Sequence, residues 1–220
     1  MFEDAFLYMK MLLDLSGLKL NQEERILFMK SAKARFNFFR NAWKNLMDQQ
    51  SETESNIPRE AIETHILKLE NEIKYFCRDL DKTLTQLLKN SDPNDFHEVI
   101  FYKKLRADYL RYFSEVSNQD EFANIVEVCE ESYREAYLLT HEKLSSHDTL
   151  TLSVALNYSI FAYFILDDTK KAFDIADKAT KAADKNINKI DFQDDKEYKM
   201  LYKSLEENLT IWKIELFDFN

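Results

Sequence analysis

Residues 101–117 read FYKKLRADYLRYFSEVS, and this stretch decides how the chain folds. At about 100° per residue of an α-helix, its apolar residues collect on one face and its charged residues on the opposite face. The apolar face consists of Tyr102, Leu105, Tyr109, Phe113 and Val116. The charged stripe consists of Lys104, Asp108, Arg111 and Glu115, with Tyr112 at its border. The pattern predicts an amphipathic helix that buries one face in a core.

The rest of the chain is equally helical in character. Its 220 residues include only one glycine and two prolines, whereas sheet proteins need many tight turns that use these residues. We therefore predict an all-α fold with short connections. From the periodicity and its breaks we expect helices over about 2–16, Asn21 to Gln50, Pro58 to Lys89, the opening stretch up to SNQD (117–120), 121–144, 149–166, 169–187 and 194–216.

Two of these boundaries have a specific chemical signal. Gly17, the only glycine, stands where a left-handed C-terminal cap would end the first helix. Asn21 is followed three positions later by Glu24, the spacing of a capping box that would begin the second helix.

Composition limits the classes of function. The formal net charge is -10, which disfavours a general nucleic-acid binder because such a protein would repel the phosphate backbone. No apolar run reaches the roughly 18 residues of a membrane span, and no secretory signal begins the chain. Cys77 and Cys129 lack the paired spacing of a metal site or redox motif. We expect a soluble, cytoplasmic protein with buried reduced thiols, no cofactor and no membrane partner.

The charged stripe of the opening stretch allows two interpretations. Lys104 with Asp108, and Arg111 with Glu115, are i,i+4 pairs typical of a solvated helix face. A second stripe at the same spacing, Lys33, Asn37, Arg40 and Lys44, carries three cations and no carboxylate. Like charges on one face repel, so we expect an external anion, or carboxylates from another helix, to compensate them.

Two further stripes repeat the spacing with amides in apolar surroundings. They are Ser153, Asn157, Ile160 and Phe164, and Leu201, Leu205, Asn208 and Trp212. A side-chain amide both donates and accepts, so Asn157 and Asn208 are candidates to bind a peptide backbone, although asparagines that bond their own neighbours remain an alternative. Together the stripes predict a groove for an extended peptide that carries an anion such as phosphate.

At these residues the sequence resembles the 14-3-3 family. The resemblance spans nearly the whole chain and follows the family's order and intervals. It is carried by LNQEER (20–25), RNAWK (40–44), FYKKLRADYLRYFSEV (101–116), SYREAYLLTHEKL (132–144), LTLSVALNYSIFAYFIL (150–166) and ENLTIW (207–212).

The resemblance implies one all-α domain over residues 1–220, with antiparallel helices stacked in a right-handed, TPR-like array around a concave groove. It implies a non-enzymatic signalling adaptor that binds phosphoserine or phosphothreonine peptides of client proteins and forms homodimers, or heterodimers with another family member. The phosphate-binding positions it implies are Lys33, Arg40, Arg111 and Tyr112. The groove and backbone-binding positions are Lys104, Asp108, Glu115, Leu156, Asn157, Ile160, Leu201, Asn208 and Trp212, where the two acids would orient the basic side chains and the ligand.

The sequence also departs from the family pattern. Phe164 replaces a usual acid, Ser204 a usual apolar groove residue, and Lys44 a usual arginine. Matching backwards from LNQEER places residues 2–16 on the family's second helix, so no counterpart of the first helix is found, and no acidic tail follows the last helix. Because the first helix packs against the partner subunit in the family, we expect weakened dimerisation.

Two other functions compete with the adaptor. A helical-repeat scaffold would bind unphosphorylated protein segments and use the cations in internal salt bridges. An enzyme would need a nucleophile or metal-ligand spacing around its histidines, or a glycine-rich phosphate loop. The four histidines are scattered and the chain has one glycine, so we predict no catalytic residue and no metal site.

Overall fold

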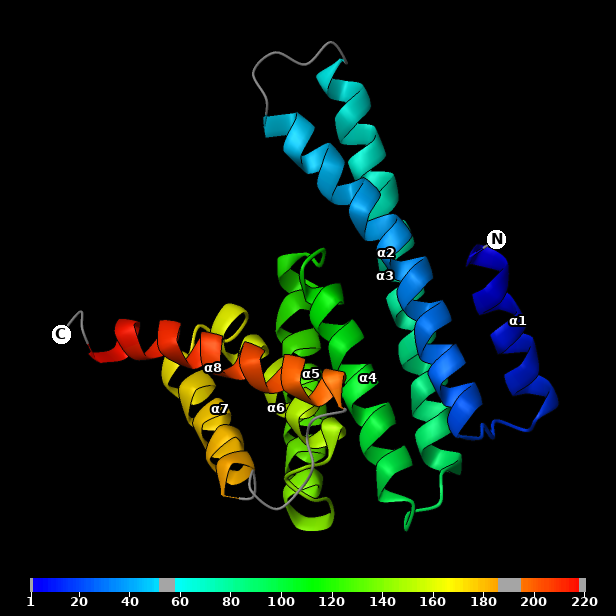
Figure 1. Ribbon diagram of the computed structural model, residues 1–220. Helices are drawn as coiled ribbons and strands as arrows, with labels where there is room; N and C mark the ends of the chain where they lie inside the picture. Colours follow the sequence, from blue (N-terminus) through cyan, green and yellow to red (C-terminus); the bar gives the residue numbers. More distant parts are fainter. Residues whose placement is uncertain (1, 52–57, 186–194, 218–220) are drawn as a thin grey trace. The chain divides into compact units, whose positions relative to one another are not determined.

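The protein is all-α, as expected from its sequence. The computed structural model describes residues 2–51, 58–185 and 195–217, and these contain helices and no strand (Figure 1). The helices are α1 (Phe2–Leu15), α2 (Gln22–Ser51), α3 (Arg59–Asn90), α4 (Phe96–Ser114), α5 (Gln119–Lys143), α6 (Thr149–Phe164), α7 (Thr169–Asp184) and α8 (Lys196–Phe217). Their described ends lie within a few residues of the predicted ones. The linker within SETESNIP (51–58), the end of the helix expected over 169–187 and the start of that expected over 194–216 lie outside the described residues.

Local hydrogen bonds explain where the helices begin and end. Gly17 has a φ of +65°, and the Leu18 N–H donates to the Leu13 carbonyl at 2.8 Å, which closes α1 with a Schellman-type turn. Asn21 Oδ1 accepts from the Glu24 N–H at 3.0 Å while Glu24 Oε2 accepts from the Asn21 N–H at 2.8 Å, so the capping box of α2 is confirmed. The helices α4 to α8 begin in a related way, with side-chain oxygens of Asp95, Asn118, Asp148, Asp168 and Asp195 accepting first-turn N–H bonds.

The chain divides into two compact units, which are described separately. The first consists of Met1–Ser91 and Tyr112–Phe122. Within it α1 packs on α2 and α2 on α3, around a cluster of aromatic rings. The ring centroids of Phe6 and Phe76 lie 5.1 Å apart, and those of Phe36 and Tyr112 are stacked at 4.7 Å. Burying one such ring contributes about 1.5–3 kcal/mol, so Tyr112 is anchored by the core of this unit.

The second unit consists of Asp92–Arg111 and Ala123–Asn220. Here α6 packs on α7 and α8, and α7 packs on α8. Tyr133 of α5 stacks on the Tyr158 ring of α6 at 5.7 Å. Most of α6 is buried, which explains why its sequence is nearly continuous in apolar residues. The single domain expected over 1–220 stays a prediction.

Apolar side chains are not confined to the two cores. On α1, Phe6 and Leu13 are buried, whereas Leu7, Tyr8, Met11 and Leu15 are exposed. Because apolar residues lie almost all round this helix, burying one side of it leaves apolar side chains exposed on the other. Among the described helices, none combines the length and the apolar character that crossing a bilayer requires.

Candidate functional site

The charged stripe of α4 is anchored by Asp108 in the second unit. This carboxylate is only 8% exposed, and it accepts hydrogen bonds from three side chains on three helices. Lys104 Nζ donates to Oδ2 at 2.7 Å, and the Tyr133 hydroxyl and Asn157 Nδ2 both donate to Oδ1 at 2.7 Å. A buried carboxylate is stable only when it is paired and hydrogen-bonded. The stripe is therefore a fixed network at Asp108, and not the solvated ladder that an isolated helix would present.

Tyr133 is the member of this network that sequence reasoning missed. Burial, reinforced by the neighbouring Asp108 carboxylate, raises the pKa of Tyr133 well above its ordinary value. The hydroxyl therefore stays protonated and remains a donor to Asp108. Nothing in the sequence distinguishes this tyrosine from the other buried aromatic residues, because its partner comes from a different helix.

Arg40 of α2 is held on one side by Glu115 in the first unit. Nε donates to Oε2 at 3.0 Å, and Nη2 donates to Oε1 and Oε2 at 3.0 and 2.8 Å. The guanidinium carbon lies 5.3 Å from the ring centroid of Tyr112, within cation–π range. The two ion-paired side chains are 25% and 22% exposed. Within the described residues Nη1 forms no hydrogen bond, so one edge of the guanidinium remains available to an acceptor.

The other members of the α2 stripe face solvent. Lys33, Asn37 and Lys44 are exposed, and neither lysine has an ion-pair partner in the described part of the chain. Of the three cations on this helix face, only Arg40 therefore has a carboxylate partner, Glu115, within the described residues. Glu115, which lies one residue beyond the end of α4, supplies for Arg40 the compensation that was expected from another helix, but a cationic surplus remains.

The two candidate amides lie on α6 and α8 in the second unit. Asn157 is half-buried, and its Nδ2 bond to Asp108 fixes the amide plane. Asn208 is also half-buried and makes no side-chain hydrogen bond with any residue that the structure describes. Neither amide bonds its own helical neighbours, which was the alternative reading of their spacing. Both retain hydrogen-bonding capacity that a peptide main chain could use.

The apolar residues expected to line the groove differ in exposure. Leu156, Leu201 and Trp212 are buried, while Ile160 is half-buried and accessible. The Trp212 ring packs 5.5 Å from that of Tyr163. The stripe on α8 that contains Leu201 and Trp212 is thus mostly core, with Asn208 at its edge.

The predicted site residues form two groups, one in each unit. Arg40, Tyr112 and Glu115 are brought together in the first unit, where Lys33 also lies on α2. Lys104, Asp108 and Asn157 are brought together in the second unit. The remaining candidates of the second unit are Arg111, Leu156, Ile160, Leu201, Asn208 and Trp212.

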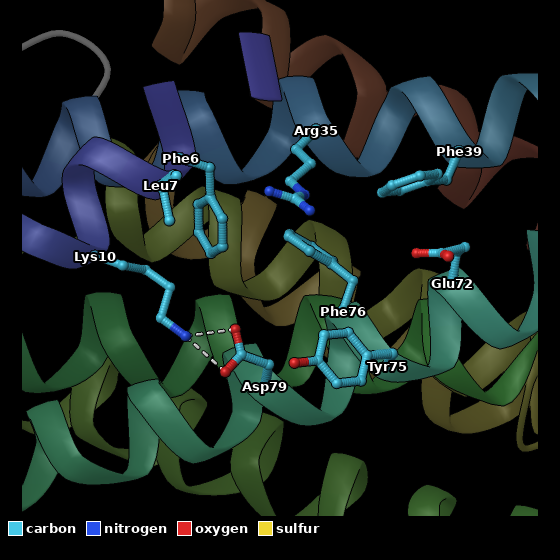
Figure 2. Close-up of a pocket in the computed structure, with 9 residues that line it drawn as sticks. All are labelled: Phe6, Leu7, Lys10, Arg35, Phe39, Glu72, Tyr75, Phe76 and Asp79. Carbon is cyan, nitrogen blue, oxygen red and sulfur yellow. Dashed lines mark hydrogen bonds and ion pairs between the residues drawn. The ribbon is translucent and has the colours of Figure 1, made fainter. Parts of the chain in front are cut away.

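A separate cavity of roughly 190 Å³ lies between α1, α2 and α3 in the first unit. None of the predicted site residues lines it. Figure 2 shows Lys10 reaching Asp79, whose two oxygens accept from the ammonium at 2.6 Å, and Arg35 pointing into the cavity. The Arg35 guanidinium lies 5.9 Å from the ring centroids of both Phe6 and Phe39. Its Nε is buried without a hydrogen-bond partner among the described residues.

No three His, Cys, Asp or Glu side chains gather as metal ligands would in residues 2–51, 58–185 and 195–217. Cys77 and Cys129 are buried and unpaired, and burial raises the pKa of both thiols. Both are therefore expected to be poor nucleophiles.

Comparison with known proteins finds one family over almost the full length. A family model described as 14-3-3 protein matches residues 1–213. The chain is 29% identical to 14-3-3 protein 2 of Entamoeba histolytica, across 99% of this chain and 91% of that protein. It is 29% identical to 14-3-3 protein beta/alpha of Xenopus tropicalis, across 97% of this chain and 87% of that protein. It is 28% identical to 14-3-3-like protein 2 of Caenorhabditis elegans, across 96% and 85% of the two chains.

Proposed function

Because the chain belongs to the 14-3-3 family, whose members are adaptors and not enzymes, we propose that it binds phosphoserine or phosphothreonine segments of client proteins. The observation that carries this proposal is that the Arg40 guanidinium is held in one orientation. Glu115 fixes the guanidinium through its Nε and Nη2 edge and leaves Nη1 open. A guanidinium that is oriented before binding loses little side-chain entropy when it meets a phosphate, and it offers charge-assisted hydrogen bonds.

Other residues would complete the phosphate site. Lys33, an exposed cation on the same helix, would add a point charge. Tyr112, held against the Phe36 ring and beside Arg40, would donate through its hydroxyl. We infer from the family resemblance that Arg111, which directly precedes Tyr112 in α4, supplies a second guanidinium.

The main chain of the client would be held by the two asparagine amides. Asp108 takes one N–H of Asn157 and so directs the rest of that amide outward. The side chain of Asn208 has no hydrogen bond within the described residues, and a half-buried amide without a partner is costly unless water or a ligand satisfies it. Backbone-directed bonds of this kind suit an extended peptide of variable sequence.

The test is a fluorescence-polarisation titration of one serine peptide with and without phosphate. In Arg40→Ala the loss of two charge-assisted bonds, each worth about 1.5–3 kcal/mol, should weaken binding of the phosphorylated peptide by about 100-fold or more. Arg40→Lys should fall in between, because an ammonium keeps the charge but not the planar fork. Arg59→Ala is the matched control, since Arg59 is exposed and within the described residues pairs with Glu63 on its own helix. Unchanged affinity in Arg40→Ala, with helicity intact, would contradict the proposal.

Family membership also supports dimerisation in general. We propose that the chain forms a homodimer or pairs with another family member through the exposed apolar residues of α1. Size-exclusion chromatography with light scattering distinguishes this from a monomer. We further propose that the clients are cytoplasmic, because buried unpaired cysteines are typical of reducing compartments.

A further inference from the structure

One face of α6 stays open to solvent and ends in an exposed aromatic ring. Along this buried helix the incompletely buried positions include Ser153, Asn157, Ile160 and Phe164, which share one face at helical spacing. Polarity changes along this face, from a hydroxyl and an amide at one end to an apolar end. Phe164 is 72% exposed, and it adjoins the proposed ligand-binding surface.

The ring of Phe164 rests on a fixed aromatic base. It meets the Tyr163 ring edge to face, with centroids 4.8 Å apart and planes at 85°. Tyr163 packs in turn on Trp212 of α8, with centroids 5.5 Å apart. Its hydroxyl donates to Glu215 Oε2 at 3.0 Å, and the Thr169 hydroxyl donates to the other oxygen of the same carboxylate at 3.0 Å. The Tyr163 ring is therefore held in place by Trp212 and Glu215 of α8. The Glu215 carboxylate already accepts bonds from Tyr163 and Thr169.

We propose that Phe164, supported by Tyr163, is an apolar side-chain subsite that makes the protein select client segments with an aromatic or aliphatic residue at one position near the phosphosite. This inference rests on the proposed function. Aromatic faces bind apolar side chains by removing both surfaces from water and also prefer aromatic partners in offset or edge-to-face contact. A ligand ammonium would gain only about 0.5–1 kcal/mol from a cation–π contact with an exposed ring and would lose part of its water shell there, so an apolar side chain is favoured at this position.

The helix geometry predicts which client position is read. Asn157 and Phe164 are two turns apart on the same face, which corresponds to about 10 Å at about 1.5 Å per residue. An extended peptide advances about 3.3 Å per residue. A client that follows the stripe therefore places a side chain at Phe164 about three residues away from the residue whose main chain Asn157 holds.

The experiment is a positional scan in a phosphoserine peptide with alanine flanks. Phe, Leu or Lys is placed at each of the four positions before and after the phosphoserine, and affinities are measured by fluorescence polarisation. With the unmodified protein, one position or two adjacent positions should favour Phe or Leu over Lys by about tenfold, the gain expected from burying one large apolar face. Phe164→Glu should reverse that preference when its affinities for the Phe, Leu and Lys peptides are compared with one another.

The controls separate this inference from the proposed function. Phe38→Glu changes the same residue type at a similarly exposed position on α2, 62% exposed, and should leave the preference intact. Circular dichroism checks that each variant folds. An absent preference, or one that survives Phe164→Glu, overturns the subsite even if phosphate dependence is strong. A preference that Phe164→Glu reverses, in peptides bound equally with and without phosphate, supports the subsite and overturns the proposed function instead. Failure of every peptide to bind overturns both.

Discussion

Replacing Asp108 by alanine should be among the most damaging single changes in the second unit. The carboxylate is nearly buried and is the common acceptor for Lys104, Tyr133 and Asn157, each at 2.7 Å. Alanine leaves all three donors without this partner. Two of them come from α5 and α6, so the loss would loosen the contacts between α4 and both neighbouring helices.

The three donors contribute unequally to the cost. The Tyr133 hydroxyl lies in the interior, and leaving it unsatisfied costs about 1–3 kcal/mol. Asn157 is half-buried and should lose about 1 kcal/mol. The Lys104 side chain is 15% exposed and can move its ammonium into water, so its loss should be below about 1 kcal/mol. We therefore expect Asp108→Ala to lower the free energy of unfolding by about 2–5 kcal/mol.

Asp108→Asn separates acceptor geometry from charge. Its amide oxygen can still accept from Tyr133 and Asn157, but its amino group would face the Lys104 ammonium, donor against donor. The expected loss is about 1–2 kcal/mol. Adding Lys104→Met should recover part of it, with a coupling of about 1 kcal/mol.

Urea unfolding followed by far-UV circular dichroism measures these differences at a constant denaturant slope. A loss under about 1 kcal/mol in Asp108→Ala would refute the reasoning, since three buried bonds to one carboxylate could not then be structural. An asparagine variant less stable than the alanine variant would refute the assigned donor pattern.

Two further predictions concern buried polar atoms without partners. Burial raises the pKa of Tyr137 to about 12, whereas a tyrosine in the unfolded chain ionises near pH 10. The free energy of unfolding should therefore fall as the pH rises between these two values. This residue should contribute up to about 1.4 kcal/mol of that fall per pH unit. Because the Tyr137 hydroxyl has no hydrogen bond in the described residues, Tyr137→Phe should be neutral or slightly stabilising at pH 7. The same substitution should make the loss of stability at alkaline pH less steep. Urea titrations at pH 7 and pH 11 measure both effects, and a large loss of stability at pH 7 would contradict the expected neutrality. Arg35→Met removes a cation–π contribution of about 0.5–1 kcal/mol. It also removes a buried Nε, which costs about 1–3 kcal/mol because it has no partner among the described residues. Thermal unfolding should therefore show equal or higher stability, and a clear decrease would mean that the cation stabilises the fold.

Much of the fold could be predicted from the sequence because its determinants are local. Helix ends follow from caps such as Gly17 and the Asn21–Glu24 pair, which depend on neighbours within a few residues. The apolar face of the 101–117 stretch is buried from Tyr102 to Val116, as its periodicity predicts. Periodicity fixes which residues share a face, and amphipathic helices bury their apolar face.

The partners of the charged residues could not be predicted, because they come from distant helices. Helical spacing predicts a pair between Glu115 and Arg111, but it gives no sign that Glu115 binds Arg40, which is 75 positions away. The spacing of Lys104 and Asp108 correctly predicts their ion pair, but not the bonds that Tyr133 and Asn157 add. The stripe of Leu201 and Trp212 was expected to line a groove, and both side chains are buried. On a helix that packs against two others, periodicity alone does not show which face remains open.

The central claim is that an oriented guanidinium on α2 recognises phosphate. Isothermal titration calorimetry tests it most directly, with the unmodified chain and one client peptide that either carries or lacks a phosphate on its serine. At fixed salt, the dissociation constant of the unphosphorylated form should exceed that of the phosphoserine form by about 100-fold or more, as two charge-assisted bonds require. Equal dissociation constants for the two forms would contradict the account.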